Sequence, residues 1–337
     1  MIKVGVVGAT GYSARESIRL LSVHPGVEVV AVASGSSAGI PLSDVLPAFR
    51  KVVDLRCETF DAASLASRCD VVFVGVPSTK SMAFGADLRA AGARVIDVGP
   101  DFRLKDPASF ATHYKTAHTA PELLSEAVYG LVPWYRESLR TANLVAVPGC
   151  YPISALTPLK ALASAGLTDI PIVIDSISGI TGAGRSLNEA YHFPEMNENL
   201  RAYQIAVHRH TPEIEQEIGH GLQVQFTPHV APLNRGILTT ITLRPKGKID
   251  IAAAFSRYDK EPFVRVLPPG SIPEVKHVRA STFCDIGWVM DNRTGNLIIV
   301  SAIDNLMGGT AGMAIQCMNV MFGLDERTGL TFGGMAP

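Results

Sequence analysis

The run VPGCYP at residues 147–152 stands directly before a stretch with the apolar spacing of a helix. Proline is favourable at the first position of a helix, so the run predicts that Cys150 lies at a helix N-terminus. The helix dipole there lowers the pKa of a thiol, and the thiolate is the nucleophilic form. We therefore predict covalent chemistry at Cys150, with a small buried thiol as the alternative. Burial is the expected state of the remaining cysteines, Cys57, Cys69, Cys284 and Cys317.

A thiolate nucleophile usually works with a base, and the run VHRHTPEI at 207–214 supplies candidates. Two histidines, an arginine and a carboxylate within six residues form a polar cluster that is costly to bury without a purpose. His208 and His210 would point the same way on a strand but not on a helix. The spacing therefore leaves open which histidine is the base.

The run GATGYSA at 8–14 joins an apolar strand to an amphipathic helix. Backbone N–H groups in such a turn can hold a pyrophosphate, so we expect a dinucleotide site, with an ordinary turn as the alternative. At the end of the second strand an NAD site normally carries a carboxylate, but this chain has serines, which suit a 2′-phosphate and favour NADP(H). The predicted cofactor residues are Gly8, Thr10, Gly11, Tyr12, Ser13, Ser34, Ser36 and Ser37.

Three further runs offer arginines that could hold a phosphate or a carboxylate. The glycine-rich run SGITGAGR ends at Arg185, DFRL contains Arg103, and NRG contains Arg235. A mobile loop or an unremarkable surface arginine is the alternative at each place.

These groups together indicate an oxidation-state change at an acyl carbon. The thiolate would attack an activated acyl group, phosphate would leave, and hydride would reduce the thioester to an aldehyde. Such a scheme needs an anion site and a proton donor, which the arginines and histidines could provide.

Two kinds of domain are expected to position these residues. Apolar runs at 2–8, 27–34, 70–76 and 94–99, with a helical stretch at 81–91, predict a doubly wound parallel sheet of the Rossmann type. Beyond residue 147, six strand-like runs with fewer helices predict an α+β domain on a mixed, largely antiparallel sheet. Residues 306–322 read as a helix that is apolar on nearly all sides and packs back on the first domain. We thus expect an NADP-binding domain at 1–147 plus 306–337, and a catalytic and oligomerisation domain at 148–305.

Charge and composition exclude several partners. Thirty basic and thirty-one acidic residues in 337 leave a net charge of −1, so no global field attracts nucleic acid or a membrane surface. The uncharged stretches 141–159 and 306–324 contain prolines, glycines and amides, and we expect buried core rather than membrane spans. Five cysteines without a paired spacing argue against disulfides and a metal site, and the N-terminus resembles no signal peptide, which together favour the cytoplasm.

The chain resembles the N-acetyl-gamma-glutamyl-phosphate reductase family, which catalyses the NADPH-dependent third step of arginine biosynthesis. The resemblance is carried by GATGYSA, DFRL, VPGCYP, SGITGAGR, AYQIAVHRHTPEI at 202–214 and AIDNLMGGTAGMAIQCMN at 302–319. It implies a homodimer or homotetramer acting on a small acyl phosphate, with Cys150 as nucleophile and His208 as acid/base. It further implies His210, Glu213, Tyr203, Arg103 and Arg185 as substrate or loop residues, and Pro77, Ser178, Gly179 and Asn305 at the cofactor. One departure is Ala14, where the family carries the last glycine of a GxxGxxG run.

Related activities remain as alternatives. Aspartate-semialdehyde dehydrogenase and a carrier-bound aminoadipyl phosphate reductase share the chemistry and differ in substrate recognition. A non-enzymatic NADP-binding sensor would share the fold, but Cys150 with the histidine cluster argues against it.

Overall fold

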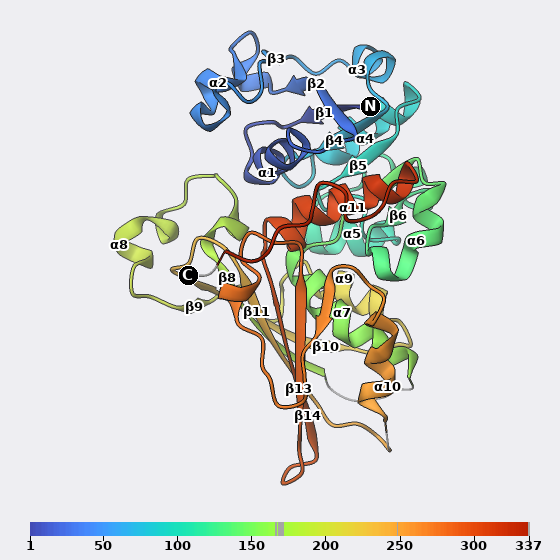
Figure 1. Cartoon of the computed structure of the whole chain (residues 1–337), viewed down its shortest axis with the longest axis vertical. Coiled ribbons are helices and arrows are strands. Elements are labelled where there is room, and N and C mark those ends of the chain that lie inside the picture. Colours follow the sequence, from blue (N-terminus) through green and yellow to red (C-terminus); the bar gives the residue numbers. More distant parts are fainter. Residues whose placement is uncertain (166, 168–171, 248, 336–337) are drawn as a thin grey trace. The chain divides into compact units, whose positions relative to one another are not determined.

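The computed structural model describes residues 1–165, 167, 172–247 and 249–335, which form two compact units (Figure 1). The first unit comprises Met1–Pro148 and Thr310–Thr331, and the second comprises Gly149–Gly309 with residues 332–335. The domain boundary near the C-terminus therefore differs from the expected one, because residues 332–335 belong to the second unit and not to the first. Its attachment there includes a hydrogen bond of 2.8 Å from the amide of Met335 to the carbonyl of Arg279.

The first unit is built on a seven-stranded parallel sheet with the order β3-β2-β1-β4-β5-β7-β6. Its strands are β1 (Ile2–Val7), β2 (Val27–Ala33), β3 (Cys57–Glu58), β4 (Val71–Val74), β5 (Val95–Asp97), β6 (Val128–Tyr129) and β7 (Leu144–Ala146). Strands β4 and β7 consist of apolar, fully buried residues, as expected for a parallel sheet that is covered on both faces. The predicted doubly wound sheet is confirmed, and its strand order reverses between β1 and β4, where such folds bind ligands.

Seven α-helices belong to this unit. They are α1 (Tyr12–Leu21), α2 (Leu42–Val45), α3 (Ala62–Arg68), α4 (Ser81–Ala90), α5 (Pro107–Tyr114), α6 (Val132–Arg140) and α11 (Gly312–Met321). Every residue of α11 is buried, and the helix contacts α1 and α6. The Cys317 thiol donates to the carbonyl of Gly130, and the Asn319 side chain meets His24 Nε2 at 3.0 Å. The predicted helix at 306–322 differs at its start, where a π-helical turn, η8 (Met307–Ala311), precedes α11.

A buried carboxyl group lies at the end of β5. Asp97 is fully buried, and its Oδ1 accepts from the amide of Gly99 at 2.9 Å while its Oδ2 accepts from the Ser81 hydroxyl at 3.1 Å. Burial, followed by the charge of Asp101, raises the pKa of Asp97 from 3.8 to about 7. The first unit therefore favours the protonated form of this group.

Asp97→Asn is expected to remove a pH dependence from the stability of the protein. Because the pKa of Asp97 is raised on folding, its contribution is fully present below about pH 4 and is lost as the pH rises through 7. Asparagine does not ionise and can keep a hydrogen bond with each neighbour. The variant should therefore gain up to about 4 kcal/mol in free energy of unfolding, relative to wild type, between pH 4 and pH 8. Urea denaturation at both pH values measures this gain. Asp175→Asn at an exposed position is the charge-matched control, and equal gains in the two variants would contradict the assignment.

The second unit is built on a mixed sheet with the order β12-β13-β14-β11-β8-β10-β9, in which β8/β10 and β12/β13 are the parallel pairs. Its strands are β8 (Ile172–Gly179), β9 (Arg201–Ala202), β10 (Val224–Ala231), β11 (Ile237–Leu243), β12 (Val264–Val266), β13 (Cys284–Asp291) and β14 (Asn296–Ile303). The predicted mixed, largely antiparallel sheet is confirmed, although residues 170–171 of one expected strand lie outside the described residues. The run DNRTGN at 291–296 forms the hairpin turn that joins β13 to β14.

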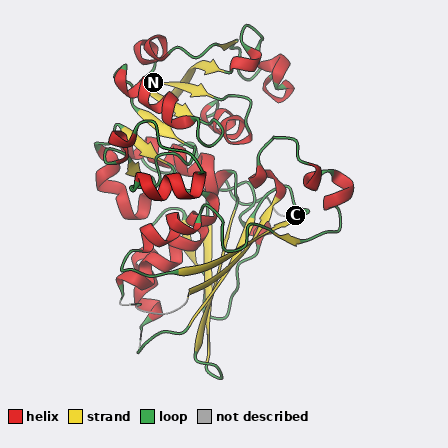
Figure 2. Cartoon of the chain, turned by 180° about the vertical axis from the view of Figure 1, so that it is seen from behind, coloured by secondary structure: helices red, strands yellow, loops and turns green. Residues whose placement is uncertain are grey.

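Helices cover one face of this sheet, as Figure 2 shows from behind. They are α7 (Cys150–Ser164), α9 (Thr211–Ile218) and α10 (Ile251–Phe255), while α8 (Phe193–Met196) lies in a separate irregular segment. Buried and half-buried residues alternate along β11, where Ile241 and Leu243 are buried and Thr240 and Thr242 are half-buried. No helix among the described residues is both long and apolar enough to cross a membrane.

Candidate active site

Cys150 is the first residue of α7, and Gly149 precedes it as an extended N-cap without a side-chain hydrogen bond. The predicted position at a helix N-terminus is therefore found, although Pro152 is the third helical residue rather than the first. Cys150 is half-buried and lines a cavity of about 300 Å³. Gly309 in η8 lies against it, since a Cβ on that glycine would be 2.9 Å from the Cβ of Cys150.

The other four cysteines are buried, as expected. Burial raises the pKa of the Cys69 thiol to about 11 and that of Cys284 to about 12. It also raises the pKa values of Cys57 and Cys317. Thiolates are therefore disfavoured at these four positions, and Cys150 is the accessible thiol of the chain.

A buried carboxylate holds Gly149, the residue before Cys150. Glu213 lies in the first turn of α9, and its Oε1 accepts a hydrogen bond of 2.8 Å from the amide of Gly149. The expected substrate or loop residue thus contacts the main chain next to Cys150, and it does not line the cavity. This contact links the runs VPGCYP and VHRHTPEI through two residues that are 64 positions apart in the sequence.

His208 and His210 both line the cavity with Cys150, although they lie in a turn before α9 and not on a strand. Their ring centroids are 4.7 Å apart. The amide of His210 donates to Nδ1 of His208 at 3.1 Å, so the proton of the neutral ring is on Nε2. Burial, followed by the charge of Arg209, lowers the pKa of His208 to about 3. At neutral pH this ring is therefore an uncharged Nε2–H donor.

Two tyrosine hydroxyls form a chain beside the thiol. Tyr203 donates to the hydroxyl of Tyr151 at 3.1 Å, and Tyr151 donates to the carbonyl of His229 on β10 at 3.0 Å. Both tyrosines line the cavity, and burial raises the pKa of Tyr203 to about 12. The two hydroxyls therefore keep their protons at neutral pH.

The remaining lining side chains come mainly from β8 and from the irregular segment between β8 and α9. The full lining comprises Cys150, Tyr151, Ser178, Gly179, Gly182, Ala183, Asn188, Tyr191, Tyr203, Gln204, His208, Arg209, His210 and Val230. Asn188, Tyr191 and Gln204 were not predicted as site residues, because this segment has no periodicity from which a common face could be inferred. Arg209 belongs to the polar run that the sequence did indicate. None of the described lining residues is a carboxylate, and Arg209 is the arginine among them.

The other predicted anion-binding residues lie elsewhere. Arg103 is buried in the first unit, where its guanidinium donates to the carbonyls of Val147 at 2.7 Å and Val98 at 3.2 Å. Arg185 is exposed and does not line the cavity. Arg235 forms an ion pair of 2.9 Å with Asp304.

Asn305 fastens the glycine-rich loop that follows β8. Its Nδ2 donates to the Thr181 hydroxyl at 2.9 Å, and its Oδ1 accepts from the amide of Gly236 at 2.7 Å. Ser178 and Gly179, at the start of this loop, line the cavity. Three residues predicted at the cofactor are therefore gathered around one loop of the second unit.

The turn between β1 and α1 has the shape expected of a pyrophosphate site. Gly8 has φ +81°, and a Cβ there would clash with the carbonyl of Gly75. Gly11 is the N-cap of α1 and provides no side-chain cap, so no side chain of the cap covers the amides of the first turn. Ala14 packs on Gly75, the residue that follows β4, and a Cβ added to Gly75 would be 3.3 Å from the Cβ of Ala14. The alanine on α1 is therefore accommodated by a glycine opposite it. Thr10, Tyr12 and Ser13 are half-buried in the same turn.

Three serines lie at the end of β2. Ser34 and Ser37 are buried, Ser36 is exposed, and residues 35–37 form a 3₁₀ turn, η1 (Gly35–Ser37), without a carboxylate. Pro77 is exposed in the turn after β4. Because β1, β2 and β4 are adjacent and parallel, their following turns lie at one edge of the sheet. The residues present therefore fit a nicotinamide dinucleotide.

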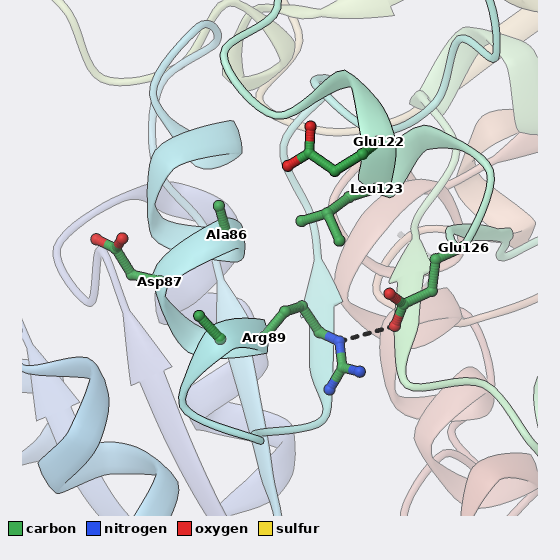
Figure 3. Close-up of a pocket in the computed structure, with 7 residues that line it drawn as sticks. Ala86, Asp87, Arg89, Glu122, Leu123 and Glu126 are labelled. Carbon is green, nitrogen blue, oxygen red and sulfur yellow. Dashed lines mark hydrogen bonds and ion pairs between the residues drawn. The ribbon is translucent and has the colours of Figure 1, made fainter.

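A second hollow, of about 400 Å³, lies in the first unit between α4 and a 3₁₀ turn, η3 (Pro121–Leu124). Figure 3 shows Arg89 of α4 reaching across it to Glu126, and the two form an ion pair of 2.8 Å. Asp87 and Glu122 make the remaining charged lining. It holds no thiol or histidine. Within the described residues, no group of three or more histidines, cysteines and carboxylates is placed to hold a metal.

Comparison with known proteins matches both units to models of one family. Residues 3–142 match the semialdehyde dehydrogenase NAD binding domain, and residues 150–305 match the semialdehyde dehydrogenase dimerisation domain. The chain is 47% identical to N-acetyl-gamma-glutamyl-phosphate reductase of Desulforudis audaxviator, with all of both chains covered. It is 45% identical to the enzyme of that name from Pelotomaculum thermopropionicum, covering 100% of this chain and 99% of the relative.

Solved structures share the fold at low sequence identity. Aspartate semialdehyde dehydrogenase II from Vibrio cholerae superposes with a TM-score of 0.73 at 16% identity, covering 96% of this chain and 98% of that one. Aspartate semialdehyde dehydrogenase with NADP from Candida albicans gives a TM-score of 0.71 at 18% identity, with the same coverage.

Proposed function

The chain belongs to the N-acetyl-gamma-glutamyl-phosphate reductase family, and from that membership we propose how its cavity performs the reaction. The activity is the reduction of N-acetyl-gamma-glutamyl phosphate, a step of arginine biosynthesis. Cys150 accepts the acyl group, and His208 stabilises the oxyanion that forms on it. The observation that carries this proposal is an accessible thiol at a helix N-terminus, in a cavity whose described lining has uncharged polar side chains, one arginine and no carboxylate.

The first stage transfers the acyl group to the enzyme. The thiolate of Cys150 attacks the γ-carbonyl carbon, a C–S bond forms, the C–O bond to phosphate breaks, and phosphate leaves. The amide of Gly149 cannot turn away during this step, because Glu213 Oε1 holds it. Glu213 is therefore a positioning residue for the nucleophile.

The second stage reduces and releases the acyl group. When bound, NADPH supplies the hydride, and Gly8, Gly11, Ser34 and Ser37 are among the residues that would hold it. His208 donates its Nε2–H to the carbonyl oxygen while that oxygen is an oxyanion. The C=O bond then re-forms, the C–S bond breaks, and Cys150 returns to the thiolate. The proton consumed overall is taken up by the released phosphate.

The cavity also supports an N-acylated substrate over one with a free amine. An ammonium group needs an opposite charge when it leaves water, and the described lining offers Arg209 but no carboxylate. An acetamido group is neutral and needs hydrogen bonds alone. This contrast favours N-acetylglutamate semialdehyde over aspartate semialdehyde as the aldehyde product.

The reverse reaction tests the substrate assignment. We expect phosphate-dependent reduction of NADP⁺ with N-acetylglutamate semialdehyde, and at least about 100-fold lower kcat/KM with aspartate semialdehyde, because its ammonium group would be left unpaired. Replacing NADP⁺ by NAD⁺ in the same assay tests the cofactor preference. Equal rates with both aldehydes would contradict the role assigned to the cavity.

The family match also supports an assembly and a location. We propose that residues 150–305 join two or four copies, since they match a dimerisation domain. We place the enzyme in the cytoplasm, where its thiols would remain reduced.

A further inference from the structure

The hydroxyl chain beside Cys150 has only one possible direction. The carbonyl of His229 can only accept, so Tyr151 must donate its proton to it. The oxygen of Tyr151 then offers only lone pairs, and the 3.1 Å contact between the two hydroxyls must use the proton of Tyr203. Tyr203 Oη is left with lone pairs alone for any other neighbour.

This direction is held by the backbone. His229 lies within β10, which pairs with β8 on one side and with β9 on the other. Its carbonyl therefore has a fixed position. Tyr151 is buried in the first turn of α7, so its hydroxyl has little freedom to turn away from that carbonyl. A ligand in the cavity meets Tyr203 as an obligatory acceptor.

Asn188, from the same irregular segment, has the opposite polarity. Its Oδ1 accepts from the amide of Ala190 at 3.0 Å as the cap of η5 (Glu189–Tyr191). The amide nitrogen is the part of this side chain that remains to donate. The segment therefore brings one acceptor and one donor to the same cavity.

The substrate has one group that an obligatory acceptor can bind. With its acids ionised, N-acetyl-gamma-glutamyl phosphate carries a single N–H, that of the acetamido group, and its carboxylate, carbonyl and phosphate oxygens all accept. We propose that Tyr203 Oη accepts the acetamido N–H, and that the direction imposed by Tyr151 and His229 makes this contact selective. The inference rests on the proposed function and adds the residue that reads the N-acyl group.

A substrate isostere separates this contact from every other. In the 2-acetoxy analogue of N-acetylglutamate semialdehyde, an ester oxygen replaces the N–H, so two acceptors would face each other at Tyr203. We expect wild type to prefer the acetamido aldehyde in kcat/KM by about 10- to 100-fold. In Tyr203→Phe that preference should fall to within about three-fold, because the acceptor is gone.

Tyr151→Phe provides a second and opposite readout. Without the partner hydroxyl, the proton of Tyr203 is free to turn toward the cavity and can be donated to the ester oxygen. The kcat/KM for the acetoxy aldehyde should then rise relative to that for the acetamido aldehyde, although Tyr203 is unchanged. General damage to the site would lower both values of kcat/KM and leave their ratio alone. Tyr114→Phe on α5, in the first unit, is the matched control and should keep the wild-type ratio.

The outcomes distinguish the two proposals. A ratio that stays at the wild-type value in both Tyr203→Phe and Tyr151→Phe overturns the assignment of Tyr203, while turnover of the acetamido aldehyde by wild type leaves the proposed function standing. Absence of turnover of either aldehyde by wild type overturns the proposed function and this inference with it.

Discussion

Cys150→Ser is expected to lower kcat by about 10³-fold or more, the largest effect of any single substitution in the chain. A serine hydroxyl at the same helix N-terminus stays protonated at neutral pH, so it neither attacks the acyl phosphate nor leaves readily from the acyl carbon. Phosphate-dependent NADP⁺ reduction with N-acetylglutamate semialdehyde measures the loss.

The loss should be specific to catalysis. Tryptophan fluorescence on addition of NADPH should give the same dissociation constant for Cys150→Ser and wild type, because the substitution changes one atom at the thiol. Cys69→Ala, which removes a buried thiol of the first unit, is the matched control and should retain activity. Activity of Cys150→Ser within ten-fold of wild type would rule out a covalent intermediate on this residue.

His208→Ala should lower kcat by about 10²- to 10³-fold, the cost of removing one donor to an oxyanion. His208→Gln should lose less, because a glutamine amide can also donate into the cavity. With a pKa lowered to about 3, His208 is uncharged throughout the range from pH 5 to pH 8, so its own titration should leave kcat unchanged there. The pH profiles of kcat for wild type and His208→Gln should therefore have the same shape over this range.

A second histidine, His220, provides a control for the replacement of a histidine near α9. His220→Asn replaces an exposed histidine at φ +60°, a conformation that asparagine tolerates, and should behave as wild type. Equal losses in His208→Ala and His208→Gln, together with the disappearance of an ionisation near pH 6, would identify His208 as a proton-transfer group instead of a fixed donor.

Features that depend on residues close together in the sequence were predictable from it. The strand, turn and helix at residues 2–21 follow from one apolar run, two glycines and one helical apolar pattern, and all of these lie within a single stretch of chain. The same holds for Cys150, whose helix position was expected from the run around it.

Contacts between distant segments were not predictable. Nothing in the run VHRHTPEI indicates that Glu213 reaches the amide of Gly149, because the contact depends on how α7 and α9 pack. An arginine in the position of Arg103 could bind an anion, but in the folded chain its guanidinium donates to main-chain carbonyls. Tyr191 and Gln204 come from a segment held by turns, where no repeat shows which side chains share a face.

The first unit is formed by two stretches of chain that are far apart in the sequence, and this affects how it folds during synthesis. Residues 310–331, which include α11, leave the ribosome about 160 residues after Pro148, a delay of roughly 8 to 32 s at ordinary elongation rates. During that time α1 and α6 lack the helix that covers them, and their apolar surface is open to chaperones or to aggregation. The last strand of the second unit must emerge before the first unit can be completed. The N-terminal half of this chain is therefore made first, but it is completed only after the whole sheet of the second unit has been synthesised.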